Sequence, residues 1–99
     1  MIYTCADLPA ILPRIDAAWQ LYAADPRAYP PEGSRPDYVP DDYGAFCGAV
    51  AEAFELNVDI DRFFLDRAYR HYNNEKFYNN QPPDAAFAAG LRIAFEQLC

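Results

Sequence analysis

Five prolines between residues 25 and 40 constrain this chain more than any other feature of its sequence. The stretch reads DPRAYPPEGSRPDYVP and also contains a glycine. Proline lacks a backbone N–H and clashes with the preceding turn, so neither a helix nor a central strand can pass through this stretch. We therefore predict a long loop over 25–40, which serves either as a surface crossing with inward-folded tyrosines or as a recognition loop.

Apolar residues recur with the period of an amphipathic helix before this loop. Leu8, Ile11, Ile15, Ala18, Trp19 and Tyr22 form one stripe. This stripe predicts a helix over 8–24. Pro13 removes a backbone donor from that helix, so we expect a kink or a late start there. Asp7 or Thr4 is available to cap the first turn.

Three more apolar stripes follow the loop and predict helices over 41–56, 60–73 and 83–98. Their inward residues are, in chain order, Tyr43, Phe46, Cys47, Val50, Ala53 and Phe54, then Ile60, Phe64, Leu65, Ala68 and Tyr72, then Phe87, Leu91, Ala94, Phe95 and Leu98. No long β alternation is present. The predicted fold is therefore all-α, a single domain over residues 1–99 built as a small bundle of about four helices with one long proline-rich crossover loop.

Acidic residues supply the expected helix starts after the loop. Asp41 or Asp42 is predicted to cap the second helix and Asp59 the third, since a carboxylate accepts hydrogen bonds from the first N–H groups of a helix. The asparagine-rich segment 73–83 is predicted to form a loop or a single turn.

Negative charge is concentrated in the first three-fifths of the chain. Residues 1–61 hold eleven acidic and three basic residues, and the whole chain carries a net charge of -7. The segment 36–61 has seven carboxylates and no lysine or arginine. Binding to nucleic acid depends on counterion release by Lys and Arg, so this composition argues against direct binding to nucleic acid or to an anionic membrane.

The three cysteines, Cys5, Cys47 and Cys99, are odd in number and widely spaced. The chain has no CxxC pair and no second histidine that could complete a zinc site. Its first residues do not resemble a secretory signal, and no apolar run approaches the length of a membrane span. We therefore expect a soluble, cytoplasmic protein whose cysteines are reduced, each a small buried hydrophobe or a surface thiol.

The sequence offers little from which to build a catalytic site. His71, Ser34 and Lys76 are the only residues of their types, and neither a GxGxxG motif nor a Walker motif is present. Nucleophilic catalysis needs a cysteine or serine next to a base, and no spacing indicates such a pair. We predict no enzymatic activity, no cofactor and no metal.

These observations favour a non-enzymatic binding protein whose acidic face docks on a basic protein or nucleoprotein complex. The predicted partner-binding residues are Asp37, Tyr38, Asp41, Asp42, Glu52, Glu55, Asp59 and Asp61. A secondary interface is predicted at Tyr29, Arg67, Arg70 and Tyr78. Such a protein would inhibit a nucleic-acid-handling complex by occupying its phosphate-binding surface, as phage-encoded anti-CRISPR and anti-restriction inhibitors do. That comparison rests on size, charge and the absence of catalytic motifs.

Two other functions fit the sequence. A homo-oligomeric structural protein or complex subunit, such as a homodimer, would use the surplus aromatics and the face formed by Ala86, Gly90 and Ile93 as its seam. A helix-turn-helix regulator would use residues 53–64, but its recognition helix would present acidic residues to the phosphates, which disfavours binding.

Overall fold

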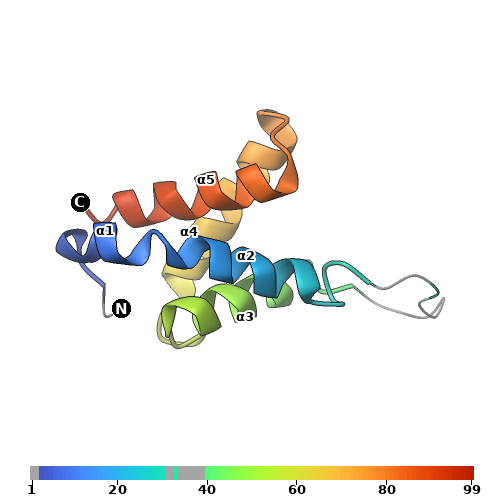
Figure 1. Cartoon of the computed structure of the whole chain (residues 1–99), viewed down its shortest axis with the longest axis horizontal. Helices are drawn as coiled ribbons and strands as arrows, with labels where there is room; N and C mark the ends of the chain where they lie inside the picture. Colours follow the sequence, from blue (N-terminus) through green and yellow to red (C-terminus); the bar gives the residue numbers. More distant parts are fainter. Residues whose placement is uncertain (1–2, 31–32, 34–39) are drawn as a thin grey trace.

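The computed structural model describes residues 3–30, 33 and 40–99, and this part of the chain is all-α, as predicted (Figure 1). The elements are the 3-10 helix η1 (Cys5–Asp7), α1 (Leu8–Ile11), α2 (Arg14–Ala24), α3 (Asp42–Phe54), α4 (Arg62–Asn73), the π-helical turn η2 (Asn74–Tyr78) and α5 (Pro83–Glu96). Helix α2 packs chiefly on α3, and α4 on α5. None of the described helices combines the length and hydrophobicity that crossing a bilayer requires.

Pro13 divides the predicted first helix into α1 and α2, which confirms the expected interruption. Thr4 is the cap residue, and it precedes η1 instead of α1. Its backbone N–H donates to Asp7 Oδ2 at 2.9 Å. Of the predicted loop 25–40, residues 25–30, 33 and 40 lie outside the helices, and the others are not among the described residues.

Helix α3 begins as predicted and ends earlier than predicted. Asp41 is its cap, with Oδ1 accepting from the Gly44 N–H at 3.0 Å. The helix stops at Phe54 instead of residue 56 because Glu55 adopts a left-handed conformation with φ 56°. The Leu56 N–H then donates to the Ala51 carbonyl at 2.8 Å, which closes the C-terminus in a Schellman-type turn.

The prediction that Asp59 caps the third helix is wrong, and α4 begins at Arg62 instead of residue 60. The N-cap position is occupied by Asp61, which makes no side-chain cap hydrogen bond. The Asn57 side chain stabilises the turn before α4, because its Oδ1 accepts from the N–H groups of Asp59 and Ile60 at 2.9 and 3.0 Å. At the other end, the segment 73–83 was predicted as a loop or a single turn, and it begins with the single π-helical turn η2, which continues α4.

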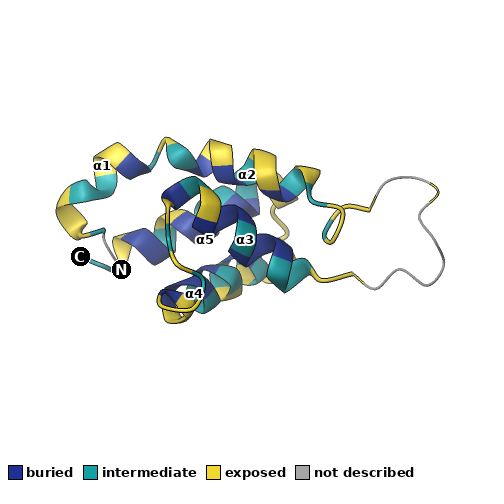
Figure 2. Cartoon of the chain, turned by 90° about the horizontal axis from the view of Figure 1, so that it is seen from below, coloured by how far each residue is buried: buried dark blue, intermediate teal, exposed yellow. Residues whose placement is uncertain are grey.

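Four aromatic rings meet at the centre of the core, one from each of the four long helices. Tyr22 of α2 stacks on Phe87 of α5 with ring centroids 5.3 Å apart, and Phe46 of α3 stacks on Tyr72 of α4 at 5.5 Å. The two stacks meet edge to face, with Tyr22 and Tyr72 at 5.6 Å. All four side chains are fully buried, so the predicted apolar stripes converge here (Figure 2).

The small residues Ala86 and Gly90 of α5 pack inside the bundle, where Gly90 lies against α4. Ala86 and Gly90 are buried, and a Cβ on Gly90 would lie 2.6 Å from the backbone nitrogen of Tyr72 in α4. This face is therefore unavailable as the predicted seam between two copies. Ile60 was predicted to point inward and is 75% exposed, because it lies in the turn before α4.

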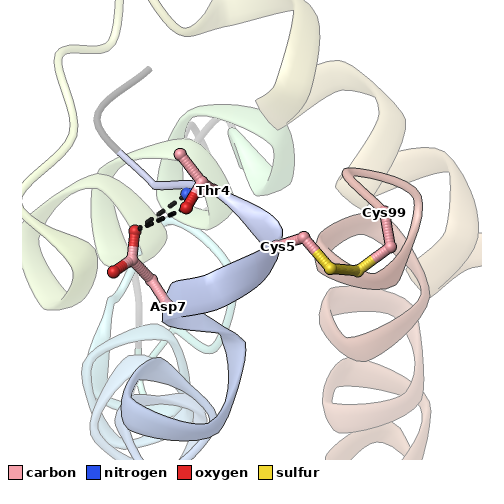
Figure 3. The surroundings of a disulfide bond; sticks show 4 residues. All are labelled: Thr4, Cys5, Asp7 and Cys99. Atoms are coloured by element: carbon pink, nitrogen blue, oxygen red, sulfur yellow. Dashed lines mark hydrogen bonds between the residues drawn. A yellow bond between two sulfur atoms is a disulfide. The ribbon is translucent and has the colours of Figure 1, made fainter.

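Cys5 and Cys99 form a disulfide (Figure 3). The prediction of reduced thiols is therefore wrong for this pair, whereas Cys47 is a buried free thiol, as predicted. Spacing could not reveal the bridge, because 94 residues separate the two cysteines. The fold places η1 beside the C-terminal end of α5 at one end of the bundle, with the two Cα atoms 4.9 Å apart (Figure 1).

Candidate partner-binding surface

Three of the predicted partner-binding acids lie exposed at the C-terminal half of α3 and in the turn that follows it. Glu52 is exposed on α3, and the side chains of Glu55 and Asp59 are 74% and 94% exposed. Asp41 is also exposed, although its carboxylate caps α3. Asp41 and Glu52 are about 16 Å apart along the helix axis, given a rise of about 1.5 Å per residue. Asp37 and Tyr38 lie outside the described residues.

Asp42 faces the interior of the bundle instead of a partner. Its carboxylate accepts hydrogen bonds from the hydroxyls of Tyr22 on α2 and Tyr69 on α4, the latter at 2.9 Å. A carboxylate at the first position of a helix is also stabilised by the helix dipole. Asp42 therefore joins three helices, and its charge is used within the fold.

The hydrogen-bond network continues from Asp42 to Lys76. The hydroxyl oxygens of Tyr22 and Tyr72 are 3.2 Å apart, and Lys76 Nζ donates to the Tyr72 hydroxyl at 3.1 Å. Since Tyr22 gives its single proton to Asp42, the Tyr72 hydroxyl supplies the proton of the bond between the two tyrosines. Burial, together with the hydrogen bond to Asp42, raises the pKa of Tyr22 well above its ordinary value. Both buried tyrosines therefore remain neutral and act as donors.

Replacing Asp42 by alanine is expected to lower the free energy of unfolding by about 2–3 kcal/mol, because buried tyrosine hydroxyls would lose a charged acceptor. Asp16→Ala is the matched control, since Asp16 also lies in the first turn of a helix but is exposed. Its expected loss is under about 0.5 kcal/mol. Urea unfolding monitored by circular dichroism measures both values, and equal losses would contradict the role assigned to Asp42.

Asp61 is also placed inside the fold. Its side chain is buried, and Oδ2 accepts from the backbone N–H of Asn57 at 3.1 Å. Its carboxylate therefore holds the turn that leads into α4 and does not lie on the surface. Asp61 is buried and Asp42 is half-buried with its carboxylate bonded to two tyrosines, so the exposed acids among the described residues of the predicted surface are Asp41, Glu52, Glu55 and Asp59.

Two arginines lie next to the exposed acids, Arg14 from a distant part of the chain and Arg62 only three residues after its acid. Arg14 Nη1 of α2 is 3.5 Å from Glu55 Oε2, and Arg62 Nη2 is 3.9 Å from Asp59 Oδ1. Arg14 also donates to the hydroxyl of Tyr3 at 2.9 Å, and that hydroxyl donates to the Phe54 carbonyl at the end of α3. The surface is thus acidic with interspersed arginines, a pattern that the acidic segment alone did not predict.

Two hollows lie beside these acids, and Arg27 and Gly48 line both of them. One, with a volume of about 330 Å³, is lined by Asp25, Glu52 and Gly48 among others. The other, of about 380 Å³, is lined by Asp41, Arg62 and Gly48 among others. Arg27 Nη2 is bonded to Asp25 Oδ2 at 2.7 Å, and this bond lowers the pKa of Asp25.

Tyr43 and Cys47 line the second of these hollows. Neither side chain is activated as a nucleophile. The Tyr43 hydroxyl donates to Asp66 of α4, and chiefly this bond raises the pKa of Tyr43 to about 12. Burial raises the pKa of the Cys47 thiol. A thiol with a raised pKa holds little thiolate at neutral pH and is a poor nucleophile.

The predicted secondary interface is spread over separate elements. Tyr29 packs edge to face on Tyr22, with ring centroids 5.6 Å apart. Arg67 donates to Gln97 at the end of α5. Arg70 is exposed and lines a third hollow, of about 460 Å³. Tyr78 is exposed at the end of η2. Arg67 and Arg70 thus share α4, whereas Tyr29 lies in the loop after α2 and Tyr78 at the end of η2.

Among residues 3–30, 33 and 40–99, no three His, Cys, Asp or Glu side chains come together in a way that could hold a metal ion. Comparison of the chain with protein-family models, with curated proteins and with solved structures found no match. The surface formed by α3 and the turn before α4 is therefore interpreted from its own chemistry.

Proposed function

We propose that this protein is a small binding protein that docks the exposed acids at the C-terminal half of α3, and in the turn after it, on a basic surface of a partner protein. The observation that carries the proposal is the exposure of Glu52, Glu55 and Asp59 on or beside a rigid helix. The net charge of -7 adds long-range attraction to such a partner.

Acids fixed on a rigid helix suit a groove that normally receives phosphates, because they present negative charge with little loss of entropy on binding. We accordingly propose that the partner handles nucleic acid and that binding inhibits it. The interspersed Arg14 and Arg62 would give the surface specificity, since a partner must also match their positive charge. No reaction is part of this proposal.

The proposal includes a cytoplasmic location, where such partners act. The Cys5–Cys99 disulfide argues against this part, because disulfides rarely persist in a reducing compartment. A protein acting in the cytoplasm would contain both cysteines as thiols. Alkylation of intact host cells, followed by mass spectrometry of the protein, distinguishes the two states.

Triple charge reversal tests the docking surface. The variant Glu52→Lys/Glu55→Lys/Asp59→Lys is expected to weaken the partner complex by about tenfold or more and to slow its association at low salt. Affinity purification with the tagged protein from its host supplies the partner, and surface plasmon resonance with the purified partner supplies the rates. The fold should persist, since all three side chains are exposed.

Asp16→Lys/Asp84→Lys/Glu96→Lys is the matched control, because it changes the net charge equally at exposed acids of α2 and α5. The proposal expects this control to retain most of the affinity. Equal weakening by both variants would mean that only net charge matters, and an unchanged complex in the first variant would exclude the surface.

A further inference from the structure

An apolar patch lies exposed where the chain enters α4. Ile60 and Phe63 are each 75% exposed. The Asp61 N–H donates to the Asn57 carbonyl and the Leu65 N–H to the Asp61 carbonyl, so the turn continues into α4 with helical spacing. Residues three apart on such a segment share one face, which makes Ile60 and Phe63 neighbours.

Opposite charges flank this patch along the same face. Asp59 lies four residues before Phe63, and its side chain is 94% exposed. Arg67 lies four residues after Phe63, with its guanidinium 5.7 Å from the centre of the Phe63 ring. The order along the stripe is thus acid, two apolar residues, then base. When two copies of the stripe lie antiparallel, the acid of each copy therefore lies opposite the base of the other.

We propose that the stripe Asp59–Ile60–Phe63–Arg67 is the contact surface of a homodimer. A twofold axis near Phe63 pairs two α4 helices antiparallel, so Phe63 meets Phe63 of the second copy. The same axis places Asp59 of each copy opposite Arg67 of the other, which forms two equivalent ion pairs. Isologous contacts of this kind are the commonest form of homodimer.

The proposed dimer interface is small, so we expect the dimer to be weak. Interfaces that bury less than about 1,200 Å² in total form weak or transient complexes, and the two copies repel each other through a net charge of -7 each. We therefore expect a weak dimer with a dissociation constant on the order of 0.1–1 mM, which corresponds to a binding free energy of only about 4–5.5 kcal/mol. The dimer and the proposed docking surface share Asp59 but not Phe63, so Phe63→Ser tests the dimer separately from the docking function.

Sedimentation equilibrium of the oxidised protein at concentrations up to about 2 mM tests the proposal. Phe63→Ser is expected to weaken dimerisation at least tenfold. Phe77→Ser is the control, because Phe77 is 67% exposed on η2, away from the stripe; this variant should dimerise like the wild type. Thermal unfolding of each variant verifies its fold.

Charge exchange tests the orientation of the pair. Asp59→Arg and Arg67→Asp should each weaken the dimer about fivefold, and the double variant should recover most of the loss, because the two opposed charges are swapped. A monomer at 2 mM, a dimer that Phe63→Ser leaves unchanged, or a double variant without recovery would overturn the proposal.

Discussion

Replacing Gly90 by alanine should lower the free energy of unfolding by about 2–3 kcal/mol, because the added methyl group has no space. Its Cβ would lie 2.6 and 2.8 Å from the backbone N and Cα of Tyr72. These backbone atoms lie in the last turn of α4, which continues directly into η2, and they cannot move aside without separating α4 from α5. The same substitution would also displace Tyr72 from the central ring cluster.

Gly48→Ala is the matched control for this effect. Gly48 also lies inside a helix, but its Cβ would meet only the tip of the Arg27 side chain at 3.3 Å. That tip is flexible, and alanine favours the helix by about 0.5–1 kcal/mol over glycine. We therefore expect Gly48→Ala to be neutral or stabilising.

Urea unfolding of the two variants under oxidising conditions measures both changes. The signs of the two effects should be opposite. If Gly90→Ala were as stable as the wild type, α4 and α5 would not approach as closely as the structure shows. If Gly48→Ala were strongly destabilising, Arg27 would be held rigidly over α3.

Loss of the Cys5–Cys99 disulfide should lower the free energy of unfolding by about 4–5 kcal/mol. The bridge closes a loop of nearly the whole chain, with a sequence separation of 94, and long loops restrict the unfolded state most. Small domains are stable by only about 5–15 kcal/mol. Reduction would therefore remove a large part of the stability of this protein.

Thermal and urea unfolding with and without dithiothreitol measure this loss. The variant Cys5→Ser/Cys99→Ser should behave like the reduced wild type and should not respond to the reductant. Cys47→Ala should still respond, because Cys47 is not bridged. Equal stability of the oxidised and reduced wild type would contradict the prediction and would remove the objection to a cytoplasmic location.

Local features of the fold were predictable from the sequence to within a few residues. The stripes that place Tyr22, Phe46, Tyr72 and Phe87 inward predicted the core correctly, because helical periodicity reports which face is buried. The errors occurred at the helix ends, because the position of an end depends on the conformation and hydrogen bonds of single residues. Glu55 in a left-handed conformation ends α3 early, and Asp61 instead of Asp59 is the first flanking residue of α4, after a turn that Asn57 stabilises.

The candidate surface was less predictable than the core. Glu52, Glu55 and Asp59 are exposed as expected, whereas Asp42 and Asp61 are used inside the fold. The sequence does not show which carboxylates will accept a hydrogen bond from a tyrosine of another helix. The exposure of Ile60 was missed because apolar residues are assigned inward by default, whereas the exposed Phe63 was not on the predicted inward stripe.

The sequence by itself determined the fold class, the interruption at Pro13, the inward faces of the helices and the excess of negative charge. These follow from backbone geometry and from burial of nearby residues. The tertiary structure alone decided which charges meet, since Arg14 and Glu55 are 41 residues apart. It also decided that Cys5 and Cys99 meet, and it converted a continuous acidic segment into a surface with interspersed arginines. Contacts at such separations depend on the path of the whole chain, which no local pattern records.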